Sequence, residues 1–384
     1  MRRLLPTFVF QAFLCLVLST GLFLRGNLPG VVAAHVAFAV AIMPLILAAM
    51  LHFIAVMTRS AAPHWAVAAL PVVAWGGGLT MLGHFAPFGY GPGYLHGGAA
   101  LALVAAFTIL LWSMRRVIFC LGTPHPGVHW YQAALLCLSL ALIMVFAMAA
   151  LPRFHRELRL IHLHLNTLGF VGLSALGTLE VLVPTVLGRP DAQATRRLRQ
   201  GLLPALAGVM LVGIGAAWQP WLAQLGALAL LLVALRAVGA WWRLAIGDPP
   251  ARDGAAAALV FVPAGFVGML AIGALQGLGL IGSFAIVPGF IAAFLLPLVT
   301  GAASHLLPAW WRPGPQGHWH AEFRRRLSRF ALSRGLLFVA GGLGAAAGWA
   351  EALWLAAAGL ILFAAALLHA LAGARRDGQL GPSR

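Results

Sequence analysis

The sequence is poor in charge. Only 9% of its 384 residues are charged, whereas a soluble domain carries about 25%. It has eight acidic residues and no lysine, so all 25 basic residues are arginine. So few charges, combined with 62% hydrophobic residues, exclude an ordinary water-exposed surface. The lipid bilayer is the solvent that this composition indicates.

Cysteine is also scarce. The three cysteines, Cys15, Cys120 and Cys137, are scattered and form no C-x-x-C motif, which excludes a disulfide framework and a zinc ribbon. The motif C-x-x-C-H is absent as well, so any haem would be held without covalent attachment. We interpret the three cysteines as small buried apolar residues.

The net charge of +17 does not indicate nucleic-acid binding. The arginines lie in short connectors between apolar segments, and they form no basic face with interleaved aromatic residues. Arginine in such connectors is typical of cytoplasmic loops of membrane proteins. The lipid bilayer is therefore the expected partner, and nucleic acid is not.

The apolar segments predict an all-α polytopic membrane protein with about twelve spans in one integral membrane domain, residues 1–384. A helix needs roughly 20 apolar residues to cross the hydrocarbon core. The longest cytoplasmic loop is predicted at 304–330. The predicted spans are 5–24, 31–57, 65–84, 95–114, 130–151, 161–187, 201–217, 219–241, 255–274, 277–303, 331–349 and 352–373.

The arginines orient these spans. With the N-terminus inside, 20 of the 25 arginines fall on the inner side. The positive-inside rule thus predicts that both termini are cytoplasmic and that the protein lies in a bacterial inner (cytoplasmic) membrane. The segment that follows Arg2 and Arg3 is too long for a signal peptide, and we interpret it as a retained first span.

An internal repeat of four spans is a further hypothesis. The phrase at 41–44 in the second span is similar to 285–288 in the tenth, and 182–188 in the sixth is similar to 295–301. These offsets suggest three pseudo-symmetric four-helix units, although apolar sequence of low complexity also produces such matches.

Histidines carry the functional signal. Histidine inside a membrane span is costly and is usually functional. The predicted topology brings five of the 14 histidines to the outer third of the membrane, on four helices. They are His35, His84, His96, His162 and His164.

Neutral imidazole binds haem iron or copper, so this layer predicts a b-type haem site with a possible copper ion. We expect His35 and His164 to be the axial ligands, with His162 and His96 as a second ligand set and His84 at the edge. His162 and His164 lie about 200° apart on a helix and face different neighbours. Asn166 shares a face with His162 and could fix its tautomer.

Charged residues near this layer have two interpretations each. The outer arginines Arg153, Arg156 and Arg159 could hold haem propionates or could contact lipid phosphate. Glu180 lies deep in the sixth span, where it could carry protons or pair with Arg236.

Together these features resemble subunit I of the haem–copper oxidase superfamily, and more closely the NnrS-type haem- and copper-containing membrane proteins linked to nitric oxide. The segment from His164 through Gly169 and Gly172 to 187–189 is similar to the signature helix of that family, and so is His35 with the apolar run that ends at 58–59. The resemblance implies an oxidase-like fold and a role with nitric oxide or with an electron donor.

The chain also departs from the oxidases. They place a histidine pair in span seven for copper and His-x-His in span ten for two haems. Here the seventh span has no histidine, and the tenth has only His305, at the wrong end. We therefore do not expect the usual oxygen-reducing binuclear centre.

Two alternatives remain at this point. A transporter of a metal ion or small solute could use the same histidine layer, with His52, Glu180 and His305 continuing the path inward. A non-catalytic assembly or sensor subunit would need large docking loops, and only 304–330 is long.

Overall fold

The computed structural model describes residues 4–85, 87–246, 255–282 and 285–379, and the described residues form helices and connecting turns, with no strand among them. Within these ranges, eleven helices are long and apolar enough to cross a membrane. A twelfth apolar helix, α18, has 16 residues. The all-α polytopic fold predicted from the sequence is confirmed.

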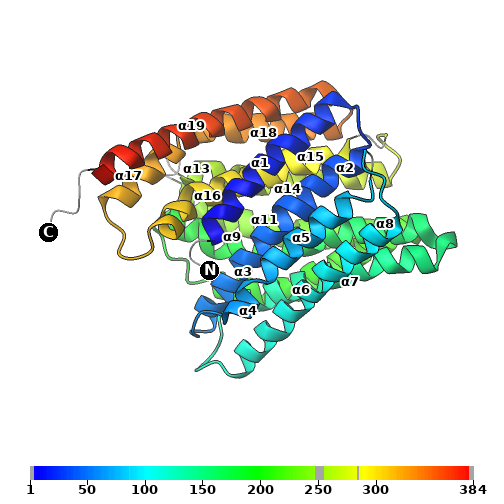
Figure 1. The fold of residues 1–384 in the computed structure, drawn as a ribbon, viewed down its shortest axis with the longest axis horizontal. Coiled ribbons are helices and arrows are strands. Elements are labelled where there is room, and N and C mark those ends of the chain that lie inside the picture. Colours follow the sequence, from blue (N-terminus) through cyan, green and yellow to red (C-terminus); the bar gives the residue numbers. More distant parts are fainter. Residues whose placement is uncertain (1–3, 86, 247–254, 283–284, 380–384) are drawn as a thin grey trace.

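The helices group into three sets of four spans (Figure 1). The first set is α1 (Leu4–Arg25), α2–η1–α3 (Gly30–His35, Val36–Ile42 and Met43–Met57), α4–α5 (Trp65–Ala68 and Leu70–Leu82) and α6 (Pro92–Ile118). The second is α7 (Gly127–Ala150), η2–α8–η3–α9 (Pro152–Phe154, His155–His164, Leu165–Gly172 and Leu173–Val186), α10 (Ala194–Trp218) and α11 (Pro220–Ala245).

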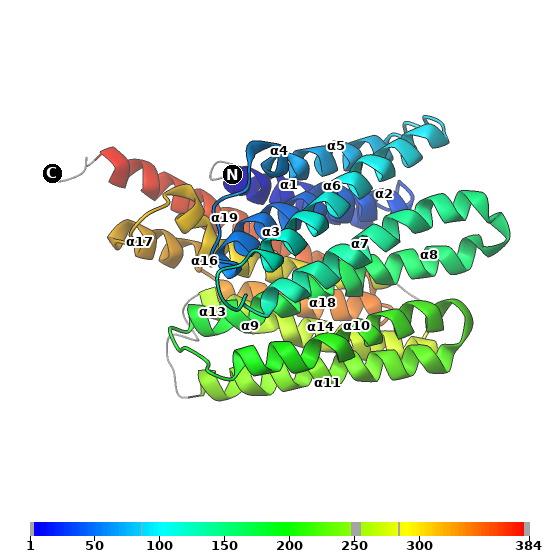
Figure 2. The ribbon, with the colours of Figure 1, turned by 90° about the horizontal axis from the view of Figure 1, so that it is seen from below.

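The third set is α13–α14 (Ala255–Leu259 and Phe261–Gly277), α15–η4–α16 (Ile286–Phe290, Ile291–Leu295 and Leu296–Trp311), α18 (Ala331–Ala346) and η5–α19 (Ala350–Ala352 and Leu353–Gln379). A short helix, α17 (His318–Leu327), precedes α18. The two ends of the described chain lie at the same end of the bundle, as an even number of crossings requires, and α2 and α8 lie at the other end (Figures 1 and 2).

The second span of each set is an inner helix. Between 61% and 78% of each inner helix is buried, against 50% or less of every other long span. Each inner helix also contains one π-helical segment: η1, η3 and η4. In every set the first and third spans pack on that segment, and the third and fourth spans pack on each other. This recurrence supports the repeat suggested by the sequence.

The register of the repeat differs from the matched phrases. The matched phrases align Pro44 with Pro288. However, Pro288 lies before the π segment of its helix, whereas Pro44 lies after the π segment of its helix. The structural counterpart of Pro44 is Pro297, because each is the second residue after a π segment. The phrase match arose from low-complexity apolar sequence, which carries little register information.

Proline explains part of this local geometry. Pro44 has no N–H, so the carbonyl of Val40, four residues earlier, has no partner in its own helix. The amide nitrogen Nε2 of Gln11 on α1 donates to that carbonyl at 2.8 Å. In the second set Ser174 takes the same place, and its hydroxyl donates to Phe170 O. The acceptor freed by Pro44 is thus satisfied inside the protein, as lipid requires.

Two predicted boundaries move. The tenth span was predicted at 277–303, but α14 ends at Gly277, and Gly279, with φ of +71°, turns the chain before α15 begins at Ile286. The same inner helix then runs to Trp311, so the loop start predicted at 304 lies inside α16. The remaining connection contains α17.

Glycine permits the closest helix contact in the third set. A Cβ at Gly265 on α14 would lie 1.8 Å from Ala293 O in η4, whereas one at Gly273 of the same helix would meet no atom within 4 Å. We therefore expect Gly265→Ala to lower the free energy of unfolding by about 1–3 kcal/mol, the usual cost of overpacking.

Thermal unfolding in detergent, followed by tryptophan fluorescence, measures the effect. Gly273→Ala is the matched control and should leave the unfolding midpoint unchanged or slightly higher. Equal midpoints for the two variants would show that η4 and α14 are not in this close contact.

Candidate functional site

A cavity of about 430 Å³, here called the outer cavity after the predicted orientation, lies at the end of the inner helices where α2 and α8 begin, away from the ends of the described chain (Figure 1). Its walls come from α2–η1, α8–η3 and the start of α15, with α5 and α7 closing the sides. Most of the lining is apolar. Four polar side chains face it from two helices: His35, Arg159, His162 and Asn166, with Thr167 beneath them.

His35 is positioned by its own helix. Its Nδ1 lies 2.8 Å from the carbonyl oxygen of Val31, one turn earlier. A carbonyl only accepts, so Nδ1 carries a proton and donates, and in the neutral ring, which apolar surroundings favour, Nε2 keeps its lone pair. The ring also packs on Phe85 at the end of α5, at 4.7 Å between centroids. His35 thus presents a neutral, oriented imidazole at the cavity.

His162 reaches the same cavity from α8. Its Nδ1 donates to the carbonyl of Ala141 on α7 at 2.8 Å, which again leaves Nε2 unprotonated. His35 and His162 are close enough to interact electrostatically. Two imidazoles in the same tautomer therefore meet at one cavity.

Asn166 does share a face with His162, as predicted. Its Nδ2 donates to the backbone carbonyl of His162 at 2.8 Å and lies 3.3 Å from Nε2 of the ring. The tautomer is set by Ala141, a backbone acceptor on another helix. The sequence gives no signal for that acceptor, because every residue carries the same carbonyl.

His164 does not line this cavity. Its Nδ1 donates to Leu160 O at 2.8 Å, and its Cβ lies against α10, 3.8 Å from where Gly213 would carry a Cβ. His164 and His35 each precede a π segment and face the third span of their own set. The repeat that makes them equivalent therefore turns His164 away from His35.

The other two outer histidines stand apart. His96 on α6 stacks on Phe146 of α7 at 5.7 Å between ring centroids and does not line the cavity. His84 packs on Phe85 at 5.3 Å, close enough to interact with His35, and its buried Nδ1 has no hydrogen-bond partner in the described structure.

Of the outer arginines, only Arg159 lines the cavity, with an exposed side chain at its mouth. Arg153 and Arg156 are exposed, and the guanidinium of Arg153 stacks on Phe154 at 4.7 Å. All three lie on η2 or the first turns of α8, because the sixth span begins about nine residues earlier than predicted.

The glycines below the histidines serve helix packing. A Cβ at Gly169 would lie 2.7 Å from Cys137 Cβ, and one at Gly177 would lie 2.6 Å from Trp130 Cβ, both on α7. Gly172 faces Phe266 at 3.5 Å. The contacts therefore show that these glycines allow the close approach of another helix.

Within the described ranges, no three His, Cys, Asp or Glu side chains lie close enough to hold a metal ion. The copper ion expected beside the haem thus has no preformed set of three protein ligands there. A haem iron needs only one or two imidazoles from the protein.

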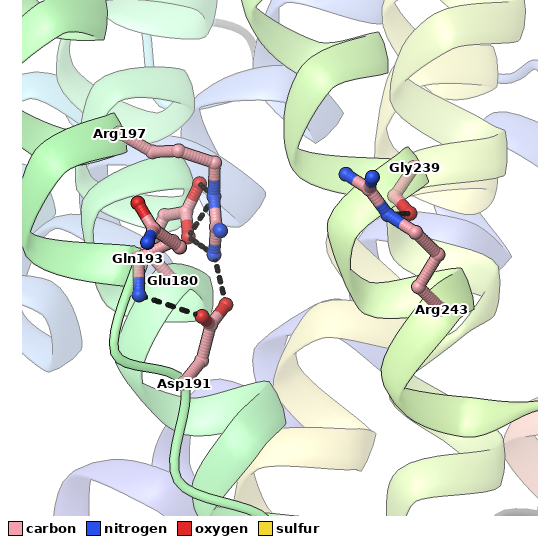
Figure 3. Close-up of polar contacts among 6 residues, drawn as sticks. All are labelled: Glu180, Asp191, Gln193, Arg197, Gly239 and Arg243. Carbon is pink, nitrogen blue, oxygen red and sulfur yellow. Dashed lines mark hydrogen bonds and ion pairs between the residues drawn. The ribbon is translucent and has the colours of Figure 1, made fainter.

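Glu180 pairs with Arg197 and not with Arg236 (Figure 3). Arg197 Nε and Nη2 donate to both carboxylate oxygens of Glu180 at 2.7–3.1 Å, and Nη2 also pairs with Asp191. Arg236 is exposed and bonds to Gln200. The guanidinium on α10 therefore neutralises the buried carboxylate on α9.

Asp191 lies in the turn between α9 and α10. Its burial opposes ionisation, but hydrogen bonds from Arg197 and from the Gln193 N–H lower the pKa of Asp191 below its usual value. The stabilisation from Asp191 is thus complete above the ordinary pKa of aspartate and is lost as the pH falls through the lowered value.

The inner half of the bundle holds a second cavity of about 110 Å³ between α3, α9 and α16. Its lining is apolar except for Tyr131, Ser174 and Thr178, and neither His52 nor His305 reaches it. His52 packs on Phe53 and Trp310, and Glu180 is held by Arg197. The polar path that a transporter would use is not formed by these three residues.

Comparison with known proteins adds no family: no family model matches this chain, and no curated protein matches it.

The buried ion pair generates a prediction. Arg197→Met would leave Glu180 buried without its cation, and we expect it to lower the free energy of unfolding by about 3–5 kcal/mol. Arg236→Met is the matched control, since Arg236 is exposed, and should change stability by less than about 0.5 kcal/mol. Chemical unfolding in detergent measures both values. A larger loss of stability for Arg236→Met than for Arg197→Met would instead support the pairing of Glu180 with Arg236 that the sequence suggested.

Proposed function

We propose that this membrane protein binds a b-type haem in the outer cavity, with His35 and His162 as axial ligands, and that it handles electrons within the membrane. One observation carries the proposal: two imidazoles, each with Nδ1 bonded to a backbone carbonyl, meet at one apolar cavity from different helices, and the weak contact of Asn166 Nδ2 with His162 Nε2 would give way to iron. This differs from the pair expected from the sequence, because His164 lies outside the cavity.

The residues present fit such a group. The cavity volume lies within the range of about 300–1,000 Å³ that is common for ligand sites. Its apolar walls suit a flat macrocycle, and Arg159 at the mouth suits carboxylates that point toward the surface. No covalent attachment motif is needed for haem b.

The protein's contribution is orientation and charge control. A bound haem would supply one-electron chemistry. The carbonyls of Val31 and Ala141 fix the tautomer and orientation of the two imidazoles, which is the usual role of groups behind a metal-binding histidine. The apolar walls exclude water, so the redox potential would respond to few charges other than Arg159.

Two axial imidazoles favour electron transfer over gas binding, because both axial positions are then filled by the protein. A role with nitric oxide, which the family resemblance implies, would need His162 or His35 to leave one position open. Transport of a metal ion or solute is the weaker hypothesis, since the inner cavity lacks the charged or imidazole groups that would continue the path.

The experiment is an absorption spectrum of the protein purified from haem-supplied cells, oxidised and then reduced with dithionite. We expect a Soret band with sharp reduced α and β bands in the wild type. His35→Ala and His162→Ala should each lose most of this signal, because each removes an iron ligand.

His164→Ala and His96→Ala are the matched controls, and both should keep the spectrum. A featureless wild-type spectrum would overturn the proposal. Loss of haem in His164→Ala but not in His162→Ala would instead support the pair expected from the sequence.

Arg159 gives an independent prediction. Arg159→Gln removes the cation at the cavity mouth, and we expect haem to dissociate about tenfold faster, as for loss of one charge-assisted hydrogen bond. Transfer of haem to excess apomyoglobin measures the rate. Arg153→Gln should leave it unchanged, because Arg153 lies outside the cavity.

A further inference from the structure

A second polar cavity lies at the opposite end of the bundle, near the termini. It has a volume of about 510 Å³ and is formed where α17 turns into α18 beside α19 (Figure 1). Its lining includes Arg325, Arg326, Ser328, Arg329 and His369. It shares no residue with the outer cavity, and the proposed haem site makes no use of it.

The arginines give this cavity a positive wall. The side chain of Arg325 is 77% exposed. Its Nε and Nη2 donate to the carboxylate of Glu322 at 2.8 Å each, and Nη1 takes no part in this pair. The hydrogen bonding from Arg325 is the largest cause that lowers the pKa of Glu322 to about 2, so both side chains of this pair stay ionised. Arg329 stacks on Phe330 at 5.0 Å and forms no ion pair with any described residue.

The backbone supplies further donors. Phe330 adopts a left-handed conformation with φ of +61° and caps α18 without a side-chain hydrogen bond. The first N–H groups of a helix have no partner within it, and those of Leu332 and Ser333 lie along the cavity wall. The N-terminal end of a helix attracts anions.

Ser328 provides the independent sign of a ligand. It lines the cavity and is only 5% exposed, yet its hydroxyl has no hydrogen-bond partner in the described structure. A buried hydroxyl without a partner costs free energy, so it normally marks a missing acceptor or donor. A phosphate oxygen would serve as that acceptor.

The neighbouring surface is apolar. Leu332 and Leu336 on α18 are 44% and 59% exposed, and Leu368 beside His369 is 67% exposed. These leucines extend from the cavity along the face that lipid covers in a membrane-spanning helix. A basic cavity suited to an anion is therefore continuous with an exposed apolar surface on the neighbouring helices.

We propose that this cavity binds the phosphate of an anionic phospholipid from the surrounding bilayer, with the acyl chains lying along α18 and α19. Basic pockets between helices at the membrane surface are suited to such headgroups. A soluble phosphate would explain the donors but would leave the exposed leucines without a role, so the lipid is the occupant that both features favour.

Native mass spectrometry of the detergent-purified protein tests the proposal, with phosphatidylglycerol, phosphatidylcholine and sodium phosphate added separately. We expect phosphatidylglycerol to bind more tightly than the other two. Loss of one arginine should weaken binding about fivefold, and the pair Arg325→Gln with Arg329→Gln about thirtyfold.

Two further variants sharpen the result. Ser328→Ala changes no charge and should weaken binding about tenfold, as for loss of one hydrogen bond to a charged group. The matched charge control is Arg115→Gln with Arg243→Gln, two exposed arginines outside the cavity that end spans on the same side as α17, and it should bind like the wild type.

Three outcomes would overturn the proposal. Equal loss in the control pair would show general attraction to basic protein and no site. Unchanged binding in both the arginine pair and Ser328→Ala would remove the cavity from the interaction. Sodium phosphate that binds as tightly as phosphatidylglycerol, or displaces it, would make free phosphate the ligand.

Discussion

The structure depends on one constraint: in lipid, every backbone N–H and C=O must find a partner inside the protein. The inner helices meet it under strain, because Pro44 and Pro297 remove donors in the middle of the bundle. Gln11 satisfies the carbonyl that Pro44 frees, the hydroxyl of Ser174 donates at the equivalent position of the second set, and Gly265 lets α14 approach the corresponding carbonyl of the third set. The π-helical segments lie at these positions in all three inner helices.

The same constraint shapes the outer cavity. The Nδ1 protons of His35 and His162 are donated to the backbone acceptors Val31 and Ala141, which fixes each ring, and the apolar walls of the cavity favour the neutral form. Neutral side chains cost least at this depth, and neutral imidazole is also the form that binds a metal. The requirement that stabilises the fold thus prepares the groups on which the proposed haem site rests.

The two most buried charged groups differ in how they are compensated: one is in an ion pair, whereas the guanidinium of Arg334 donates to the backbone carbonyl of Leu327. The one carboxylate deep among the described spans, Glu180, is held by Arg197 together with Asp191. Arg325 on α17 and Arg329 in the following turn are more exposed and line a cavity at the end of the bundle. A protein with eight acidic residues and 25 arginines leaves much of its positive charge to its surroundings, and anionic lipid is the counterion that a bilayer offers.

The sequence alone predicted the helical class and the approximate spans, because the length and hydropathy of each apolar segment are set by its own residues. It suggested the four-span period, but with the wrong register, and the outer histidine layer stays a prediction. The choice of His162 over His164 was left to the tertiary structure, since residues two apart on a helix face different neighbours and only the packing of α7 and α10 decides which meets His35. The partner of Glu180 was decided in the same way, by which arginine the turn at Asp191 brings to it. Helical periodicity shows which residues share one face of a helix. Which neighbour that face contacts depends on the packing of helices that are distant in the chain.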